Sequence, residues 1–158
     1  MTTPATPTFE DRYFEDYTIG ETGTGGTRVI DAADISLFAH LTGDHHPAHT
    51  DSGYATPKFG SVIAHGVLTF GVVVGLTVEY NGRAVAYGYD RIRFPRPVVP
   101  GDTVRATSEV VDLADHRTPA IGLVTKQYTA VNQHGDTVLV CKHVLAVDRR
   151  TQRKEPNL

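Results

Sequence analysis

The sequence lacks several features that mark well-known classes of protein. It has one cysteine in 158 residues, Cys141, which excludes an intramolecular disulfide and favours a reducing cytoplasm. Its charges nearly cancel, with 15 Lys and Arg against 18 Asp and Glu, so it has no basic excess of the kind that binds nucleic-acid phosphates. We therefore expect a cytoplasmic protein without a nucleic-acid partner.

The sequence also lacks a secretory signal, because residues 1–12 have no cationic start followed by an apolar stretch. Its one long apolar run, residues 62–80, approaches the length of a membrane span but carries His65, Glu79 and several glycines. We interpret this run as a core helix and expect no membrane partner. No repeat, low-complexity block or linker divides the chain, so we predict a single domain over residues 1–158, with flexible arms at 1–12 and 150–158.

The second half of the sequence predicts a sheet. Four segments are rich in Val, Ile, Tyr and Thr and are separated by turn signals: 83–94, 102–113, 120–131 and 136–147. We expect them to form an antiparallel meander, with a type II turn at Pro100 and Gly101 and another reversal at Gly135. A further strand is expected at 25–30, followed by a helix that begins after Asp31 and ends at Gly43. The fold class is α+β.

Residues 43–51, GDHHPAHTD, concentrate three histidines and two aspartates around Pro47. Asp44 and His49 lie five residues apart, which would separate them on a regular helix, but Pro47 favours a turn-bearing loop in which they converge. A carboxylate beside an imidazole can hold a water and move its proton near neutral pH. The sequence therefore predicts a general acid/base pair, although such residues are also common turn formers.

Two other readings of this region concern a metal ion and the stretch AHG at 64–66. His45, His46, His49 and Asp51 are residue types that bind metals, but Pro47 interrupts the helical spacing such a site requires, and we assign no metal ligands. AHG opens the long apolar run, so the Gly66 N–H is expected to be an unpaired donor at a helix N-terminus. Such a donor can stabilise a carbonyl oxygen that gains negative charge, although AHG also suits a tight helix entry.

Three stretches resemble the MaoC-type acyl-thioester dehydratases, the family that includes the (R)-specific enoyl-CoA hydratases. These stretches are residues 41–68, 94–102 and 13–21. The resemblance implies a single hot-dog domain, in which an antiparallel sheet wraps around a long central helix. It also implies a homodimer whose sheets are continuous.

The same resemblance assigns roles to individual residues. Asp44 and His49 match the catalytic pair of the family pattern Gly-Asp-x-(Asn/His)-Pro-x-His-x-Asp, and Gly66 matches the glycine whose amide holds the thioester oxygen. His46 stands where the (R)-specific hydratases carry Asn, which concerns the substrate subgroup more than the chemistry. His65 matches the histidine of the family's Ile-Ala-His-Gly run and is assigned a structural role.

The implied reaction interconverts enoyl and 3-hydroxyacyl thioesters, with coenzyme A or phosphopantetheine as part of the substrate and no other cofactor. The substrate would be an acyl-CoA or an acyl carrier protein. Arg91 and Arg93, two residues apart on one strand face, are candidates for contacts with its phosphates, or else a solvated strand edge. Tyr54 and Phe59 are candidate pocket walls, and Val72, Val73, Val74 and Leu76 are candidates for an acyl tunnel or simply for the core.

Three alternative functions stay open at the level of sequence, because one fold supports several chemistries. The same pair could hydrolyse the thioester, as in hot-dog thioesterases. An amine such as an amino acid could add to the enoyl thioester in place of water. A catalytically silent protein could bind acyl thioesters as a sensor or assembly subunit.

Overall fold

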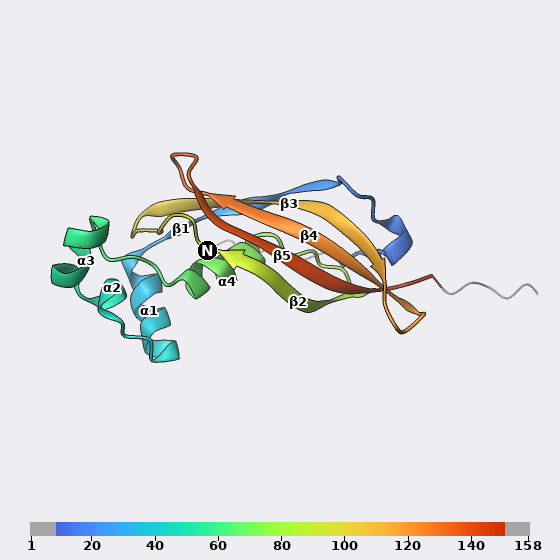
Figure 1. Ribbon diagram of the computed structural model, residues 1–158, viewed down its shortest axis with the longest axis horizontal. Coiled ribbons are helices and arrows are strands. Elements are labelled where there is room, and N and C mark those ends of the chain that lie inside the picture. Colours follow the sequence, from blue (N-terminus) through green and yellow to red (C-terminus); the bar gives the residue numbers. More distant parts are fainter. Residues whose placement is uncertain (1–8, 151–158) are drawn as a thin grey trace, which may run out of the picture.

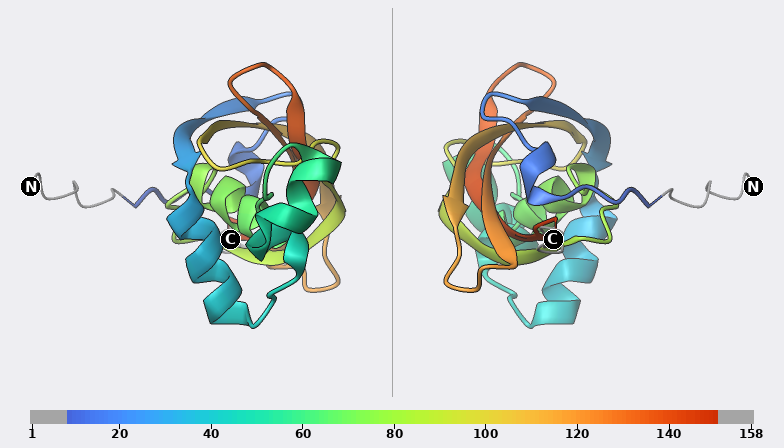
Figure 2. Two further views of the ribbon diagram at one scale, coloured as in Figure 1. Left: turned by 90° about the vertical axis from the view of Figure 1, so that its left-hand side faces the viewer. Right: turned by 90° about the vertical axis from the view of Figure 1, so that its right-hand side faces the viewer.

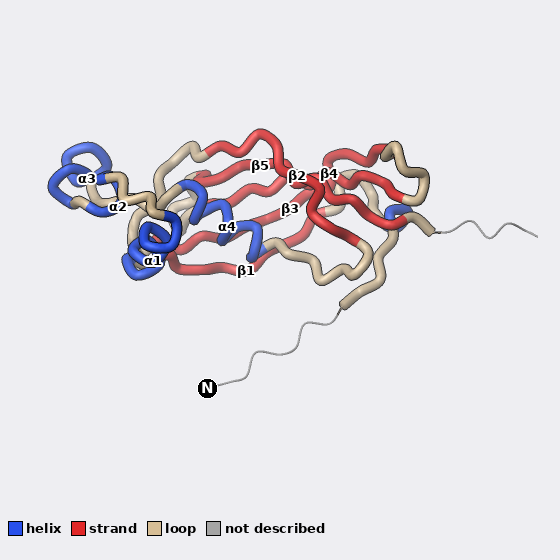
Figure 3. The backbone as a smooth tube through the Cα atoms, turned by 90° about the horizontal axis from the view of Figure 1, so that it is seen from below, coloured by secondary structure: helices blue, strands red, loops and turns tan. Residues whose placement is uncertain are grey.

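The computed structural model describes residues 9–150 and shows a curved five-stranded sheet with one helix, α4, along its concave face (Figures 1 and 3). The strands are β1 (Thr22–Ile30), β2 (Ala84–Arg93), β3 (Asp102–Asp115), β4 (Ile121–Val131) and β5 (Thr137–Asp148). The helices are η1 (Phe14–Asp16), α1 (Ala32–Thr42), α2 (Pro47–Thr50), α3 (Ser52–Phe59) and α4 (Gly66–Leu76). Figure 2 shows the sheet curving around α4, which confirms the α+β class and the hot-dog architecture.

The central helix is shorter than predicted, covering Gly66–Leu76 instead of residues 62–80. Residues 63 and 64 lie outside the helix, and their amides bond to other segments: Ile63 N–H donates to Ala48 O at 3.0 Å and Ala64 N–H to Val98 O at 2.7 Å. At the other end the Thr77 hydroxyl donates back to Val73 O at 2.8 Å. The apolar residues before Gly66 are therefore part of the packed interior without being helical, whereas Val78 and Tyr80 after the helix are exposed.

The strand order β1-β3-β4-β5-β2 corrects the predicted meander. All neighbours are antiparallel, and β3, β4 and β5 do form a meander, but β2 pairs with β5 at the opposite edge from β1. The reason is the connection over residues 94–101, which carries three prolines and is too long for a hairpin. The reversal at its end is as predicted, since Gly101 has φ 94° and Asp102 N–H donates to Val99 O at 3.0 Å.

The core lies between α4 and the sheet. Residues of β4 alternate between buried and half-buried along its length, as expected for a strand with one face on the core. Val73 of α4 meets this face and is fully buried, as is Cys141 of β5. Burial raises the pKa of the Cys141 thiol to about 11, so it stays protonated at neutral pH.

The predicted flexible arms fall mainly on residues 1–8 and 151–158, which lie outside the described residues. The parts of these arms that the structure does describe, residues 9–12 and 150, make contacts with the rest of the chain. Glu10 N–H donates to Tyr80 O at 2.9 Å, and the Arg150 guanidinium pairs with Asp16 at 2.6 Å. Between residues 9 and 150, no helix combines the length and the apolar character that crossing a membrane requires.

Candidate active site

The segment that carries Asp44 and His49 lies at one end of the sheet, where α1, α2 and α3 gather (Figure 1). Helix α1 ends as predicted at Gly43, whose φ of 77° only glycine adopts without strain. Four residues later Pro47 begins α2, which is one turn long and places His49 near its end. The sequence predicted a loop here, and the chain instead combines a short loop with this helical turn.

Asp44, His49 and His65 converge in space. Each contributes one side-chain atom, a carboxylate oxygen or a ring nitrogen, and these atoms all lie within 4.8 Å of one another. Asp44 is exposed, His49 is half-buried and His65 is 2% exposed. No direct hydrogen bond joins the side chains of Asp44 and His49 among the described residues, and one water with two hydrogen bonds of about 2.8 Å can bridge a separation of up to 4.8 Å.

The orientation of His49 is set by its Nδ1 atom, which lies 2.7 Å from the carbonyl oxygen of Ile63. A carbonyl oxygen can only accept, so Nδ1 carries a hydrogen and donates it. In the neutral ring the lone pair then belongs to Nε2. That nitrogen can take a proton from a water or return one.

His65 contacts both members of the pair. Its ring stacks on the His49 ring with centroids 3.8 Å apart, and its Nε2 donates to the Asp44 carbonyl oxygen at 3.0 Å. Its Nδ1 is buried without a hydrogen-bond partner among the described residues. Asp44 also serves the turn, because its Oδ1 accepts from His46 N–H at 3.2 Å. The turn-forming and proton-handling readings of Asp44 are therefore compatible.

The three side chains are poorly arranged to share one metal ion. The lone pair of an imidazole nitrogen lies in the plane of its ring, and the rings of His49 and His65 are stacked with only 26° between their planes. An ion about 2 Å from both nitrogens cannot lie in both planes. The alternative set of His45, His46, His49 and Asp51 does not bring its ligand atoms together among the described residues, and Asp51 caps α3 by accepting from Gly53 N–H at 2.8 Å.

Gly66 is the first residue of α4, as the AHG stretch predicted. Its N–H is one of the donors that a helix leaves free at its N-terminus, and no acceptor for it occurs among the described residues. A Cβ atom at this position would lie 2.7 Å from the Phe94 ring. The helix entry therefore has both a free donor and a close packing requirement for glycine.

Of the other candidate residues, His46 adjoins this cluster, because its ring meets the His49 ring edge-on with centroids 6.1 Å apart. His46 caps α2, its Nδ1 accepting from Ala48 N–H at 3.2 Å, while its ring meets the edge of Tyr54. Tyr54 and Phe59 of α3 are 36% and 42% exposed and line none of the described pockets.

The predicted phosphate contacts of Arg91 and Arg93 stay a prediction, and a β-bulge between Asp90 and Arg93 interrupts the regular pairing of β2 with β5 there. Arg91 sits in this bulge with a φ of 53°, and both arginines are exposed.

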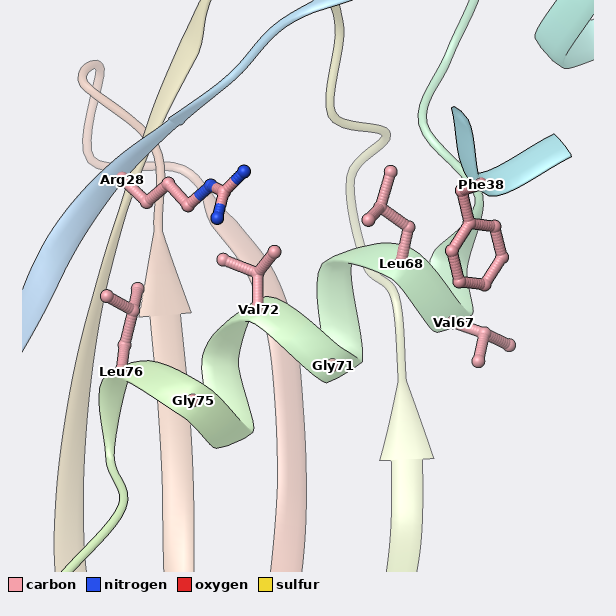
Figure 4. Close-up of a pocket in the computed structure, with 8 residues that line it drawn as sticks. All are labelled: Arg28, Phe38, Val67, Leu68, Gly71, Val72, Gly75 and Leu76. Atoms are coloured by element: carbon pink, nitrogen blue, oxygen red, sulfur yellow. The ribbon is translucent and has the colours of Figure 1, made fainter. Parts of the chain in front are cut away.

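The predicted acyl tunnel divides between opposite sides of α4. Val72 and Leu76 line an open groove with Arg28 and Phe38 (Figure 4). Val73 belongs to the core, and Val74 lines a separate, partly open cavity between α4 and the sheet. Consecutive helical residues point about 100° apart, so four neighbours cannot line one passage. Sequence reasoning missed the polar residues of that cavity, Lys126 and His143, whose inward strand positions were the available signal.

Comparison with known proteins shows that most of the chain matches one protein family. Its residues 16–133 match the family model described as "MaoC like domain". It is 40% identical over 93 residues to a protein of Mycobacterium tuberculosis named "3-hydroxyacyl-thioester dehydratase Z", covering 55% of this chain and 62% of that one. The chain thus spans less than two thirds of that relative's length.

Two further likenesses cover more of the relative. An "(R)-specific enoyl-CoA hydratase" of Rhodospirillum rubrum is 37% identical over 107 residues, covering 66% of this chain and 74% of that protein. The solved structure of a "Monoamine oxidase regulatory protein" from "Archaeoglobus fulgius" superposes with a TM-score of 0.83 and 34% identity, over 89% of this chain and 96% of that one.

Proposed function

The chain belongs to the MaoC-like domain family, and on that premise we propose that it interconverts enoyl and 3-hydroxyacyl thioesters by adding or removing water. The observation that carries this proposal is the convergence of Asp44 and His49, with side-chain atoms within 4.8 Å of each other, a separation that one water can bridge. The fixed Nδ1–H of His49 and the free N–H at the start of α4 complete an arrangement for conjugate addition.

In the hydration direction, Asp44 orients a water while His49 Nε2 accepts one of its protons. The water oxygen bonds to the β-carbon of the enoyl thioester, and the double-bond electrons move toward the thioester oxygen. The Gly66 N–H stabilises the negative charge there, which one such donor does by about 10²–10³ in rate. His49 then returns the proton to the α-carbon as the carbonyl re-forms. Dehydration follows the same steps in reverse.

We propose that the substrate is an acyl-CoA or an acyl carrier protein, and that no metal, flavin or nicotinamide takes part, because this chemistry moves only a proton and a water. We further propose a homodimer formed through β2. This edge strand is paired on one side only, by β5, and its Val85 and Tyr87 are 67% and 60% exposed. The buried thiol of Cys141 supports a cytoplasmic location.

A single assay tests the reaction. The protein is incubated with crotonyl-CoA, and loss of the conjugated absorbance is followed together with release of free thiol. Loss of absorbance without thiol, and a product heavier by one water, supports the proposal. Thiol release would instead indicate a thioesterase, an adduct formed only with added glycine would indicate amine addition, and inertness toward every acyl donor would favour a silent binding protein.

A further inference from the structure

The cavity that Val74 lines lies between α4 and the sheet, at the far end of α4 from the Asp44 and His49 pair. Its volume is about 230 Å³, and it lies between α4, β2, β4 and β5, partly open to solvent where Val78 and Ala86 are exposed. Its walls are largely apolar, formed by Val74, Val78, Ala84, Ala86 and Leu145. Val74 stands eight residues after Gly66 on the same helix, which is about 12 Å along the axis. An acyl chain whose thioester oxygen meets Gly66 could therefore extend toward this cavity.

Two polar side chains project into the cavity from neighbouring strands. Lys126 of β4 and His143 of β5 are register partners, and they are 3% and 7% exposed. The Lys126 ammonium pairs with Glu79, whose other carboxylate oxygen accepts from the Tyr17 hydroxyl at 3.0 Å. The positive charge of Lys126 is therefore already compensated, and an added carboxylate would face Glu79.

Only one of the two ring nitrogens of His143 has a hydrogen-bond partner among the described residues. Its Nδ1 is 2.7 Å from the Tyr128 hydroxyl, and its ring stacks on Tyr89 with centroids 4.2 Å apart. Its Nε2 is buried with no hydrogen-bond partner among the described residues. Burial and the nearby Lys126 lower the pKa of His143 to about 4, so the ring is neutral at physiological pH. A buried polar nitrogen without a partner is unfavourable, which favours a ligand group that bonds to it.

We propose that the cavity receives the distal part of the acyl chain and that His143 Nε2 forms a hydrogen bond with a neutral oxygen on it. A hydroxyl group fits best, since it can donate or accept and so suits either tautomer of the neutral ring. The apolar walls hold the intervening methylene groups. This inference rests on the proposed function, because it takes the thioester to lie at Gly66. The substrate class is thus an enoyl thioester that is oxygenated far from its reacting end.

The test compares trans-2-decenoyl-CoA with 10-hydroxy-trans-2-decenoyl-CoA, which differ only in the terminal hydroxyl. One satisfied hydrogen bond of about 1 kcal/mol corresponds to roughly a five- to tenfold higher kcat/KM for the hydroxylated substrate. His143→Phe should abolish this preference while leaving the rate with crotonyl-CoA within about twofold, because the short chain does not reach the cavity. The matched control His134→Phe, at an exposed turn outside the cavity, should keep it.

The outcomes separate this inference from the proposed function. Equal kcat/KM values for the two decenoyl substrates in the unmodified protein, with crotonyl-CoA hydrated normally, overturn the cavity assignment alone. If no enoyl-CoA is hydrated, the proposed function fails. The cavity is then tested by calorimetric titration with decanoyl-CoA and 10-hydroxydecanoyl-CoA. Five- to tenfold tighter binding of the hydroxylated compound, lost in His143→Phe, supports the assignment, and equal dissociation constants reject it.

Discussion

The imidazole rings of His49 and His65 lie stacked, with centroids 3.8 Å apart and 26° between their planes. His65 is nearly fully buried, and its Nε2 donates to the backbone carbonyl of Asp44. One buried ring therefore contacts both residues that we propose to hold the water. His49 has a second anchor in the Ile63 carbonyl, but Asp44 is otherwise held by its own exposed turn. This makes His65 a positioning residue for Asp44.

We expect His65→Phe to lower kcat about tenfold while leaving KM and the melting temperature nearly unchanged. The phenyl ring keeps the stack on His49 but loses the hydrogen bond to Asp44 O, so the loop can shift, and small displacements in a catalytic pair are costly. Stability should hold because the variant also removes the unpartnered Nδ1, which offsets the lost bond. Steady-state kinetics and thermal unfolding measure the two effects.

A purely structural role for His65 predicts a different pattern, in which the melting temperature falls and kcat at low temperature stays normal. His65→Gln provides the comparison, since an amide can still donate to Asp44 O but cannot stack. It should retain more of kcat than His65→Phe if the hydrogen bond is the important contact. The reverse order would assign the effect to the stack.

Asp44→Asn and His49→Ala should each reduce turnover at least 100-fold, the usual scale for loss of a positioned acid or base. Neither side chain is deeply buried, so both variants should keep the fold. Circular dichroism checks the fold, and hydration of crotonyl-CoA checks the rate. Near-normal turnover in both variants would remove the proposed catalytic pair. His45→Ala, at the exposed neighbouring histidine, is the control and should stay near the unmodified rate.

Gly66→Ala should lower both the melting temperature and kcat/KM, although alanine is the better helix former by about 1 kcal/mol. The added methyl group would lie 2.7 Å from the Phe94 ring, so the ring or the helix entry must move. Combining Gly66→Ala with Phe94→Ala relieves the contact and should recover much of the melting temperature. Because alanine keeps the backbone N–H, full recovery of activity relative to Phe94→Ala alone would show that Gly66→Ala acts through the contact with Phe94. No recovery of the melting temperature in the double variant would reject that contact as the cause.

Features set by neighbouring residues were predictable from the sequence. The cap at Asp31, the stop at Gly43 and the turn at Gly101 depend on local backbone chemistry, and all three occur as expected. The position of β2 beside β5 was not predictable in this way. It depends on contacts between segments far apart in the chain, which turn signals do not report.

The candidate active site likewise combines features set by neighbouring residues with features set by contacts between distant segments. The convergence of Asp44 and His49 follows from Pro47, which lies between them and ends the possibility of a regular helix across the pair. The contact of His65 with both could not be derived from spacing, since it depends on how the chain before α4 packs against α2. His143 and Lys126 are adjacent only because β4 and β5 pair in one particular register. Read separately, each is an ordinary strand residue.

The depressed pKa of His143 predicts how stability changes with pH. In the folded protein burial first, and Lys126 second, lower this pKa from its ordinary 6.5 to about 4. Between these values the unfolded chain binds a proton that the folded chain does not, so the free energy of unfolding falls as the pH drops from 6.5 toward 4. Above 6.5 both states are neutral at this residue, and it contributes no pH dependence.

The variant His143→Phe removes this contribution to the pH dependence of stability, and the other titrating groups are common to both proteins. Urea unfolding at pH 7 and at pH 4.5 should therefore show a larger loss of stability for the unmodified protein than for the variant. Equal losses would mean that the pKa of His143 is not lowered in the folded protein, and would contradict the burial of its ring as the dominant influence on it.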